Sequence, residues 1–164
     1  MSPPERKTPI HVLVLEDNPA EVQLIHTALT NSHLRCELTV LPDADAALAY
    51  LRRQMPYEQA VPPDLILVDL DLANRGGQIV LATLHEDPTL RRIRVLVLSS
   101  SRHVKTTLRQ YEMPETSLIV KSPRRDYSAR LLRTVDEFWQ ALLQIFEEPI
   151  SPADKNGDDF GHEN

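Results

Sequence analysis

Five short segments rich in aliphatic residues recur along the chain. They cover residues 10–15, 37–41, 65–68, 93–98 and 118–120. Four of them are nearly continuous apolar runs, whereas the second alternates between polar and apolar residues. Short continuous runs of this kind are typical of strands buried on both faces, as in a parallel sheet. We therefore predict five strands.

A segment with helical spacing of apolar residues follows each predicted strand. Asn18-Pro19 marks the first helix start, because asparagine caps helices and proline suits the first helical position. The other helices are expected at residues 43–51, from residue 76 to the break at Asp87-Pro88, at about 102–111 and at about 125–147. This alternation predicts an α/β fold, a doubly wound five-stranded parallel sheet with right-handed crossovers and five flanking helices.

The two ends of the 164-residue chain differ from the segment between them. Residues 1–9 are polar and rich in proline, and residues 149–164 are acidic and contain glycine, so we expect a flexible start and a disordered tail. One domain is expected at residues 10–148, which is long enough to bury a sizeable core. There is no apolar stretch typical of a membrane span or a secretion signal, so we expect a cytoplasmic protein.

Charge and cysteine content exclude several classes of function. The formal net charge of −6 argues against a nucleic-acid-binding surface. Cys36 is the only cysteine, which rules out an internal disulfide, and the six histidines show no metal-ligand spacing.

Polar side chains stand at the ends of four of the five predicted strands. Glu16-Asp17 follows the first strand, Asp69 the third, Ser99 the fourth and Lys121 the fifth. Because parallel strands bring their carboxyl ends to one edge of the sheet, these groups should converge. Each has an ordinary explanation by itself, such as an acidic helix start, a cap or a solvated charge. Their shared position at strand ends favours a functional site.

The chemistry of this set is that of phosphoryl transfer. Carboxylates in one cleft repel each other unless a cation neutralises them, and oxygen ligands suit Mg²⁺. An aspartate beside Mg²⁺ can act as a nucleophile toward phosphorus and form an aspartyl phosphate. Lys121 would neutralise phosphoryl oxygens, and the Ser99 hydroxyl would hydrogen-bond one of them.

This ordered set resembles the receiver domain of two-component response regulators. The resemblance covers about residues 10–147 and includes Glu16-Asp17 and Asp69 within Leu-Ile-Leu-Val-Asp-Leu-Asp-Leu. Its remaining members follow Asp69 in the family's order and are Gly77, Ser99 and Lys121. The resemblance implies the flavodoxin-like receiver topology and phosphoryl transfer from a histidine kinase to Asp69.

The resemblance also implies a role for each of the other site residues. Glu16, Asp17 and Asp69 would hold Mg²⁺ together with the backbone carbonyl of Asp71. Ser99 would move toward the phosphoryl group, and Lys121 would pair with it.

A narrower resemblance points to a class of stand-alone regulators. Only the tail follows the domain, and three short segments are similar to regulators that partner bacterial phytochromes: Asp69–Leu72, Lys121–Pro123 and Glu137–Trp139. The expected partner is therefore a histidine kinase of the phytochrome type.

The chain departs from the family pattern at three positions. Ala73 replaces a usual proline, and Ser122 separates Lys121 from Pro123. Leu118 stands where the family usually has an aromatic switch residue. We therefore hypothesise that signalling uses loop order and dimerisation instead.

Two other functions compete with the receiver. Asp69-Leu70-Asp71 resembles the Asp-x-Asp pair of haloacid-dehalogenase-type phosphotransferases, but the later acidic pair of that family is missing after Lys121. A pseudo-receiver that only binds proteins would not need the acid, serine and lysine set. We expect self-catalysed phosphotransfer and dephosphorylation but no small-molecule turnover, so the protein is not expected to be an enzyme.

The last predicted helix has a wider apolar face than one sheet needs. Its apolar positions spread over an arc of roughly 160°, whereas a helix on a sheet needs about 100°. The surplus flank predicts a homodimer interface, although loops or the tail could cover it instead. That flank consists of Leu132, Trp139, Leu143 and Phe146.

Overall fold

The structure is a computed structural model that describes residues 9–30, 34–101, 104–121 and 124–146. Side chains are described in these ranges except at residues 124–125 and 142–146. The chain forms two compact units, Met1–Leu132 and Arg133–Asn164. The predicted flexible start, apart from Pro9, and the predicted disordered tail lie outside the described residues, so both remain predictions.

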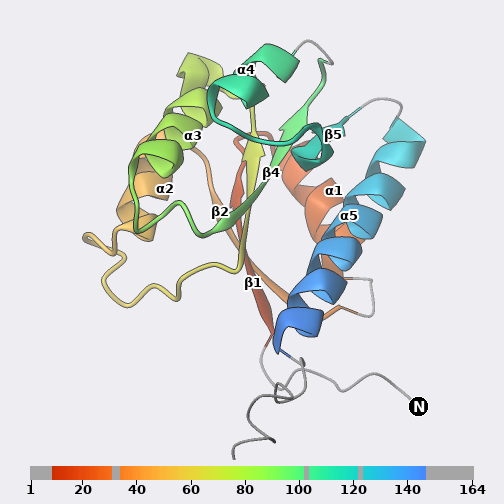
Figure 1. The fold of residues 1–164 in the computed structure, drawn as a ribbon, viewed down its shortest axis with the longest axis horizontal. Helices are drawn as coiled ribbons and strands as arrows, with labels where there is room; N and C mark the ends of the chain where they lie inside the picture. The colour runs from red at the N-terminus through yellow and green to blue at the C-terminus, as the bar shows by residue number, and fades with distance from the viewer. Residues whose placement is uncertain (1–8, 31–33, 102–103, 122–123, 147–164) are drawn as a thin grey trace, which may run out of the picture. The chain divides into compact units, whose positions relative to one another are not determined.

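A parallel five-stranded sheet lies in the first unit, as the sequence predicts. The strand order is β2-β1-β3-β4-β5 (Figure 1). The chain adds β2 on one side of β1 and then β3 on the other side, so the order in which strands are added reverses between β1 and β3. In doubly wound sheets, ligands bind outside the carboxyl ends of the strands at this reversal. The strands are β1 (Ile10–Leu15), β2 (Cys36–Leu41), β3 (Leu65–Asp69), β4 (Arg94–Ser99) and β5 (Leu118–Val120).

Five α-helices alternate with these strands and confirm the predicted fold class. In the first unit, α1 and the start of α5 lie on one side of the sheet, and α2, α3 and α4 lie on the other (Figure 1). Local signals set the helix starts: Asn18 Oδ1 accepts the Ala20 N–H at 2.9 Å, and Asp43 Oδ1 accepts the Ala46 N–H at 2.8 Å. The helices are α1 (Pro19–Thr30), α2 (Ala44–Leu51), α3 (Gly76–Glu86), α4 (Lys105–Gln110) and α5 (Arg124–Phe146).

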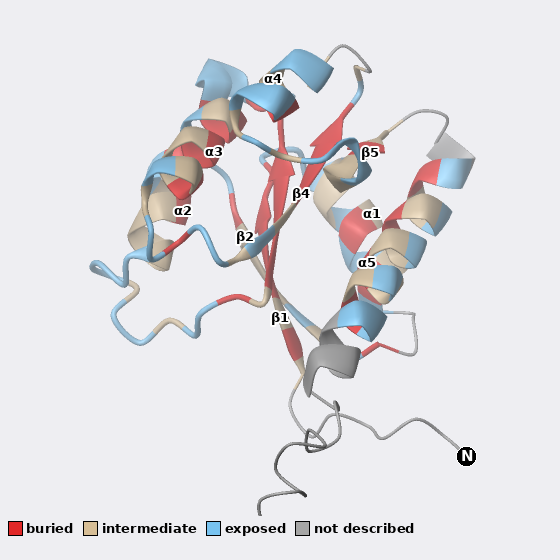
Figure 2. Ribbon diagram, viewed as in Figure 1, coloured by how far each residue is buried: buried red, intermediate tan, exposed pale blue. Residues whose placement is uncertain are grey.

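The apolar core follows the central strands, which are the buried ribbons in Figure 2. Every residue of β3 is buried, which explains why its sequence shows no polar alternation. The core on the side of α2, α3 and α4 joins alternate residues of the strands to these helices. It includes Leu13, Leu15, Ile66, Val68, Val97, Ala44, Ala47, Val80, Leu81, Leu84 and Leu108.

Gly77 brings the first turn of α3 against the end of β3. A Cβ atom at this position would lie 2.5 Å from the carbonyl oxygen of Asp69 and 3.0 Å from Leu70 Cδ2. Only a residue without a side chain allows this approach, so Gly77 fixes the distance between the helix and the strand end that carries Asp69.

Helix α5 spans 23 residues. Trp139 is only 5% exposed, contrary to the expectation that its side chain is surplus to the core. Leu132 is half-buried, and the side chains of Leu143 and Phe146 lie outside the described set. The homodimer interface therefore remains a prediction. Of its four predicted residues, Trp139 is corrected to a buried residue.

None of the helices in the described part of the chain has the length and apolar character needed to span a membrane.

Candidate functional site

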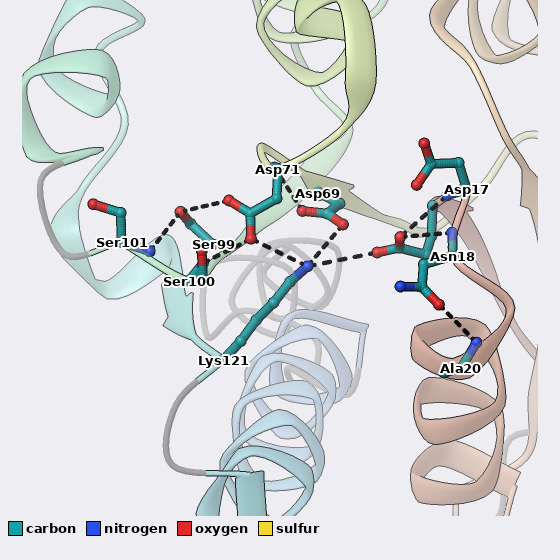
Figure 3. A network of polar contacts seen from close by, with 10 residues as sticks. Asp17, Asn18, Ala20, Asp69, Asp71, Ser99, Ser100, Ser101 and Lys121 are labelled. Carbon is teal, nitrogen blue, oxygen red and sulfur yellow. Dashed lines mark hydrogen bonds and ion pairs between the residues drawn. The ribbon is translucent and has the colours of Figure 1, made fainter.

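The carboxyl ends of β1, β3, β4 and β5 bring their polar residues together, and Lys121 lies among them (Figure 3). The Lys121 ammonium is 2.8 Å from Asp69 Oδ2, 3.4 Å from Asp71 Oδ2 and 3.8 Å from Glu16 Oε2. The predicted convergence is therefore observed for Glu16, Asp69 and Lys121 and, through Asp71, for Ser99.

Asp69 is the last residue of β3, and its side chain is buried. Its Oδ2 accepts a hydrogen bond from the Lys121 ammonium, and its Oδ1 accepts the Asp71 N–H at 2.7 Å. The adjacent Leu70 N–H donates to the Leu98 carbonyl at 2.9 Å, which ties this strand end to β4. Asp69 is thus a carboxylate held in one orientation at the edge of the sheet.

Glu16 is a buried carboxyl group that lacks a full set of partners. It is 2% exposed, and its Oε1 accepts the N–H groups of Asp17 and Asn18, each at 3.1 Å. Within the described residues its Oε2 has no hydrogen-bond partner. Burial first, and the neighbouring Asp69 second, raise the pKa of Glu16 to about 8. The site therefore holds an acid that gains from an added cation.

The pKa of Glu16 predicts a pH dependence of stability in metal-free protein. Between the usual pKa of 4.5 and the folded value of about 8, the folded state binds a proton that the unfolded state lacks. Raising the pH through this range should therefore lower the free energy of unfolding, by at most about 1.4 kcal/mol per pH unit. Urea unfolding in the presence of a chelator, at several pH values from about 5 to 8, measures this slope.

The matched variant for this experiment is Glu16→Gln, which cannot titrate at this position. We expect its stability to change less with pH than that of the wild-type chain. Parallel stability curves for the two proteins would show that Glu16 is not the titrating group.

Lys121 supplies the positive charge of the site. Its partial burial would by itself lower its pKa, but Asp69 first and Glu16 after it raise the pKa above the usual value. The Lys121 N–H also donates to the Ser99 carbonyl at 2.9 Å, so the pairing of β4 with β5 places the lysine beside the serine. The carboxylates around Lys121 therefore stabilise its charged ammonium form.

Ser99 and Asp71 are joined through their side chains. The Ser99 hydroxyl, which is buried, donates to Asp71 Oδ1 at 3.4 Å and accepts the Ser101 N–H at 3.1 Å. Asp71 Oδ2 accepts the Ser100 N–H at 2.9 Å. Although partial burial opposes it, these hydrogen bonds to Ser100 and the Lys121 charge lower the pKa of Asp71.

Sequence reasoning assigned only the backbone carbonyl of Asp71 to the site and missed its side chain. Its position two residues beyond Asp69 was the available hint, but this spacing does not determine whether the side chain points to solvent or to the site.

Among the described residues predicted for the phosphorylation site, Asp17 differs from the others because its side chain lies outside this network. The residue is exposed, and Figure 3 shows its carboxylate without a dashed contact. Among the described residues, no three His, Cys, Asp or Glu side chains are grouped so that they could hold a metal ion. The carboxylates instead surround the Lys121 ammonium.

Comparisons with known proteins agree with this geometry. Residues 12–131 match the response regulator receiver domain family. Response regulator Rcp1 of Synechocystis sp. is 33% identical over 141 residues, which cover 86% of this chain and 96% of that protein.

Solved structures give the same result. The phosphorylated cyanobacterial phytochrome response regulator RcpA matches with a TM-score of 0.72 and 35% identity, over 82% of this chain and 96% of that one. The Mn²⁺-bound form of Rcp1 matches with a TM-score of 0.70 and 32% identity, over 88% and 99% of the two chains.

Proposed function

The chain belongs to the response regulator receiver domain family, and from this membership we propose that it accepts a phosphoryl group on Asp69 from a histidine kinase. The observation that carries the assignment to Asp69 is its buried carboxylate, 2.8 Å from the Lys121 ammonium at the end of the central strand β3. Membership in this family also argues against the haloacid-dehalogenase-type alternative.

The proposed reaction is a displacement at phosphorus. A carboxylate oxygen of Asp69 attacks the phosphorus of a phosphohistidine and forms a P–O bond while the P–N bond breaks. The electron pair of that bond leaves with the imidazole. Lys121 is near enough to Asp69 to stabilise the negative charge of the phosphoryl oxygens, and Ser99 would donate its hydroxyl to one of them.

We propose that Mg²⁺ is the cofactor, held by Glu16, Asp17, Asp69 and the backbone carbonyl of Asp71. The buried Oε2 of Glu16, for which the described residues provide no hydrogen bond, supports such an ion, and oxygen is the donor atom that Mg²⁺ prefers. In the structure Glu16 and Asp69 contact the Lys121 ammonium, so binding of the ion requires that these carboxylates turn toward it. The solved Mn²⁺-bound form of Rcp1 supports a divalent ion in a related chain. When bound, Mg²⁺ would supply positive charge that lowers the repulsion between the carboxylates and an incoming phosphoryl group.

The proposed partner is a phytochrome-type histidine kinase. RcpA is a cyanobacterial phytochrome response regulator, and it is 35% identical to this chain over the aligned residues. We further propose that the chain acts in the cytoplasm, has no substrate turnover beyond its own phosphorylation and dephosphorylation, and pairs with a second copy through the flank that includes Leu132.

Phosphotransfer tests the proposal directly. A phytochrome-type kinase labelled on its histidine should lose its label to this chain in the presence of Mg²⁺, and a chelator should prevent the transfer. The product should be sensitive to hydroxylamine, because an acyl phosphate is attacked by this nucleophile. Continuous hydrolysis of a phosphate monoester would instead favour the enzyme alternative, and absence of transfer from any donor, including acetyl phosphate, would favour the pseudo-receiver.

A further inference from the structure

The Asp71 side chain holds the polar groups that the phosphorylated site would use. Its carboxylate contacts the Ser99 hydroxyl at 3.4 Å, the Ser100 N–H at 2.9 Å and the Lys121 ammonium at 3.4 Å (Figure 3). We propose that Asp71 is a positioning residue that keeps Ser99 and Lys121 in the unphosphorylated arrangement by standing in for the phosphoryl group. This inference rests on the proposed function of Asp69.

The Ser99 hydroxyl cannot donate to Asp71 and to a phosphoryl group on Asp69 at the same time. A serine hydroxyl has one hydrogen to donate, and here Asp71 Oδ1 receives it. A phosphoryl oxygen on Asp69 can accept that hydrogen only after the bond to Asp71 is broken. At 3.4 Å this bond is long for a hydroxyl donor, so the exchange opposes phosphorylation only weakly at this contact.

The Lys121 ammonium, unlike the Ser99 hydroxyl, can donate to more than one carboxylate at once. Its ammonium has three hydrogens and lies within 4 Å of Asp69, Asp71 and Glu16. A phosphoryl group on Asp69 would compete with the Asp71 carboxylate for this charge and would also repel it. Because the Asp71 side chain is 34% exposed, it has a route toward solvent when it loses these contacts.

Release of Asp71 would change the segment that follows β4. The shortest of these three carboxylate contacts is the 2.9 Å bond from the Ser100 N–H, and Ser99 in turn accepts the Ser101 N–H. Both bonds tie the start of this loop to the site. Loss of the Ser100 bond when Asp69 is phosphorylated would change how the start of this loop is held, which provides an output that does not need an aromatic residue at Leu118.

The test compares Asp71→Asn with the wild-type chain and with Asp45→Asn. Asp45 lies exposed in the first turn of α2, so its replacement changes the net charge equally without touching the site. The first measurement is the amide NMR shifts of Ser100 and Ser101 without any phosphoryl donor. The second is the affinity for beryllofluoride, a phosphoryl analogue, at saturating Mg²⁺ so that metal affinity does not enter.

We expect Asp71→Asn to move both amide signals toward their positions in beryllofluoride-bound wild-type protein. Its affinity for beryllofluoride should rise by roughly tenfold, the size expected from removing competing charge-assisted contacts. Asp45→Asn should match the wild type in both measurements. Unchanged amide signals, or an affinity that is equal or lower in Asp71→Asn, would overturn the proposal and leave Asp71 as a structural cap.

The two measurements also separate this inference from the proposed function. If wild-type protein binds no beryllofluoride and accepts no phosphoryl group, the proposed function fails. The amide shifts of donor-free Asp71→Asn would then still show whether Asp71 holds the loop, because that measurement needs no phosphorylation.

Discussion

Asp69→Asn should abolish phosphoryl acceptance entirely. The amide oxygen of asparagine is a poor nucleophile, and the substitution also removes the carboxylate closest to the Lys121 ammonium, at 2.8 Å. Intact-mass measurement after incubation with acetyl phosphate and Mg²⁺ should show one added phosphoryl group on the wild-type chain and none on the variant. The two side chains have nearly the same shape, so steric disruption does not account for a loss of phosphorylation in the variant.

Asp71→Asn is the matched control for this experiment. Asp71 is the only other aspartate whose carboxylate contacts Lys121 among the described residues, and it lies two positions beyond Asp69. We expect this variant to retain phosphorylation. The reverse result, with phosphorylation lost in Asp71→Asn and kept in Asp69→Asn, would make Asp71 the nucleophile and refute the assignment.

Gly77→Ala should lower the free energy of unfolding by about 3 kcal/mol. The new methyl group would lie 2.5 Å from the Asp69 carbonyl oxygen, which belongs to the backbone of a buried strand and cannot turn away as a side chain can. Either α3 or the end of β3 must shift. Because the contact involves the backbone of Asp69, a shift of the β3 end should lower the rate of phosphorylation together with stability.

Gly76→Ala provides the opposite expectation at the neighbouring position. Its added methyl group would meet Leu72 Cδ1 at 3.5 Å, an ordinary van der Waals contact. Since alanine favours a helix more than glycine does, this variant should gain about 0.5 to 1 kcal/mol. Urea unfolding of both variants measures the contrast, and equal effects at the two positions would contradict the proposed close approach of Gly77.

The strands and their polar ends were predictable because one physical pattern determines both. A strand buried on two faces has no room for polar side chains, so the charged or hydroxyl residue beyond each apolar run marks where the chain leaves the core. Asp69 and Lys121 were found in this way. The helix before Tyr111 is expected from about residue 102; residues 102 and 103 lie outside the described ranges, and the structure places α4 at Lys105–Gln110.

The contacts of Asp71 and the burial of Trp139 could not be read from the pattern. A carboxylate just beyond a strand end can turn to solvent or back to the site, and the choice depends on donors such as the Ser100 N–H, which is 29 positions away in the sequence. The burial of an aromatic side chain similarly depends on what packs against it, and the spacing of apolar residues along one helix does not contain this information.

The order of the strands also has a consequence for synthesis of the chain. β1 pairs with β3 through contacts such as Val12 with Leu65. The edge of β1 that faces away from β2 therefore has no partner until β3 has been made. At usual translation rates, 53 residues take about 3 to 10 s. During this interval β1 exposes apolar residues and unpaired backbone groups, the conditions under which nascent chains aggregate or recruit chaperones.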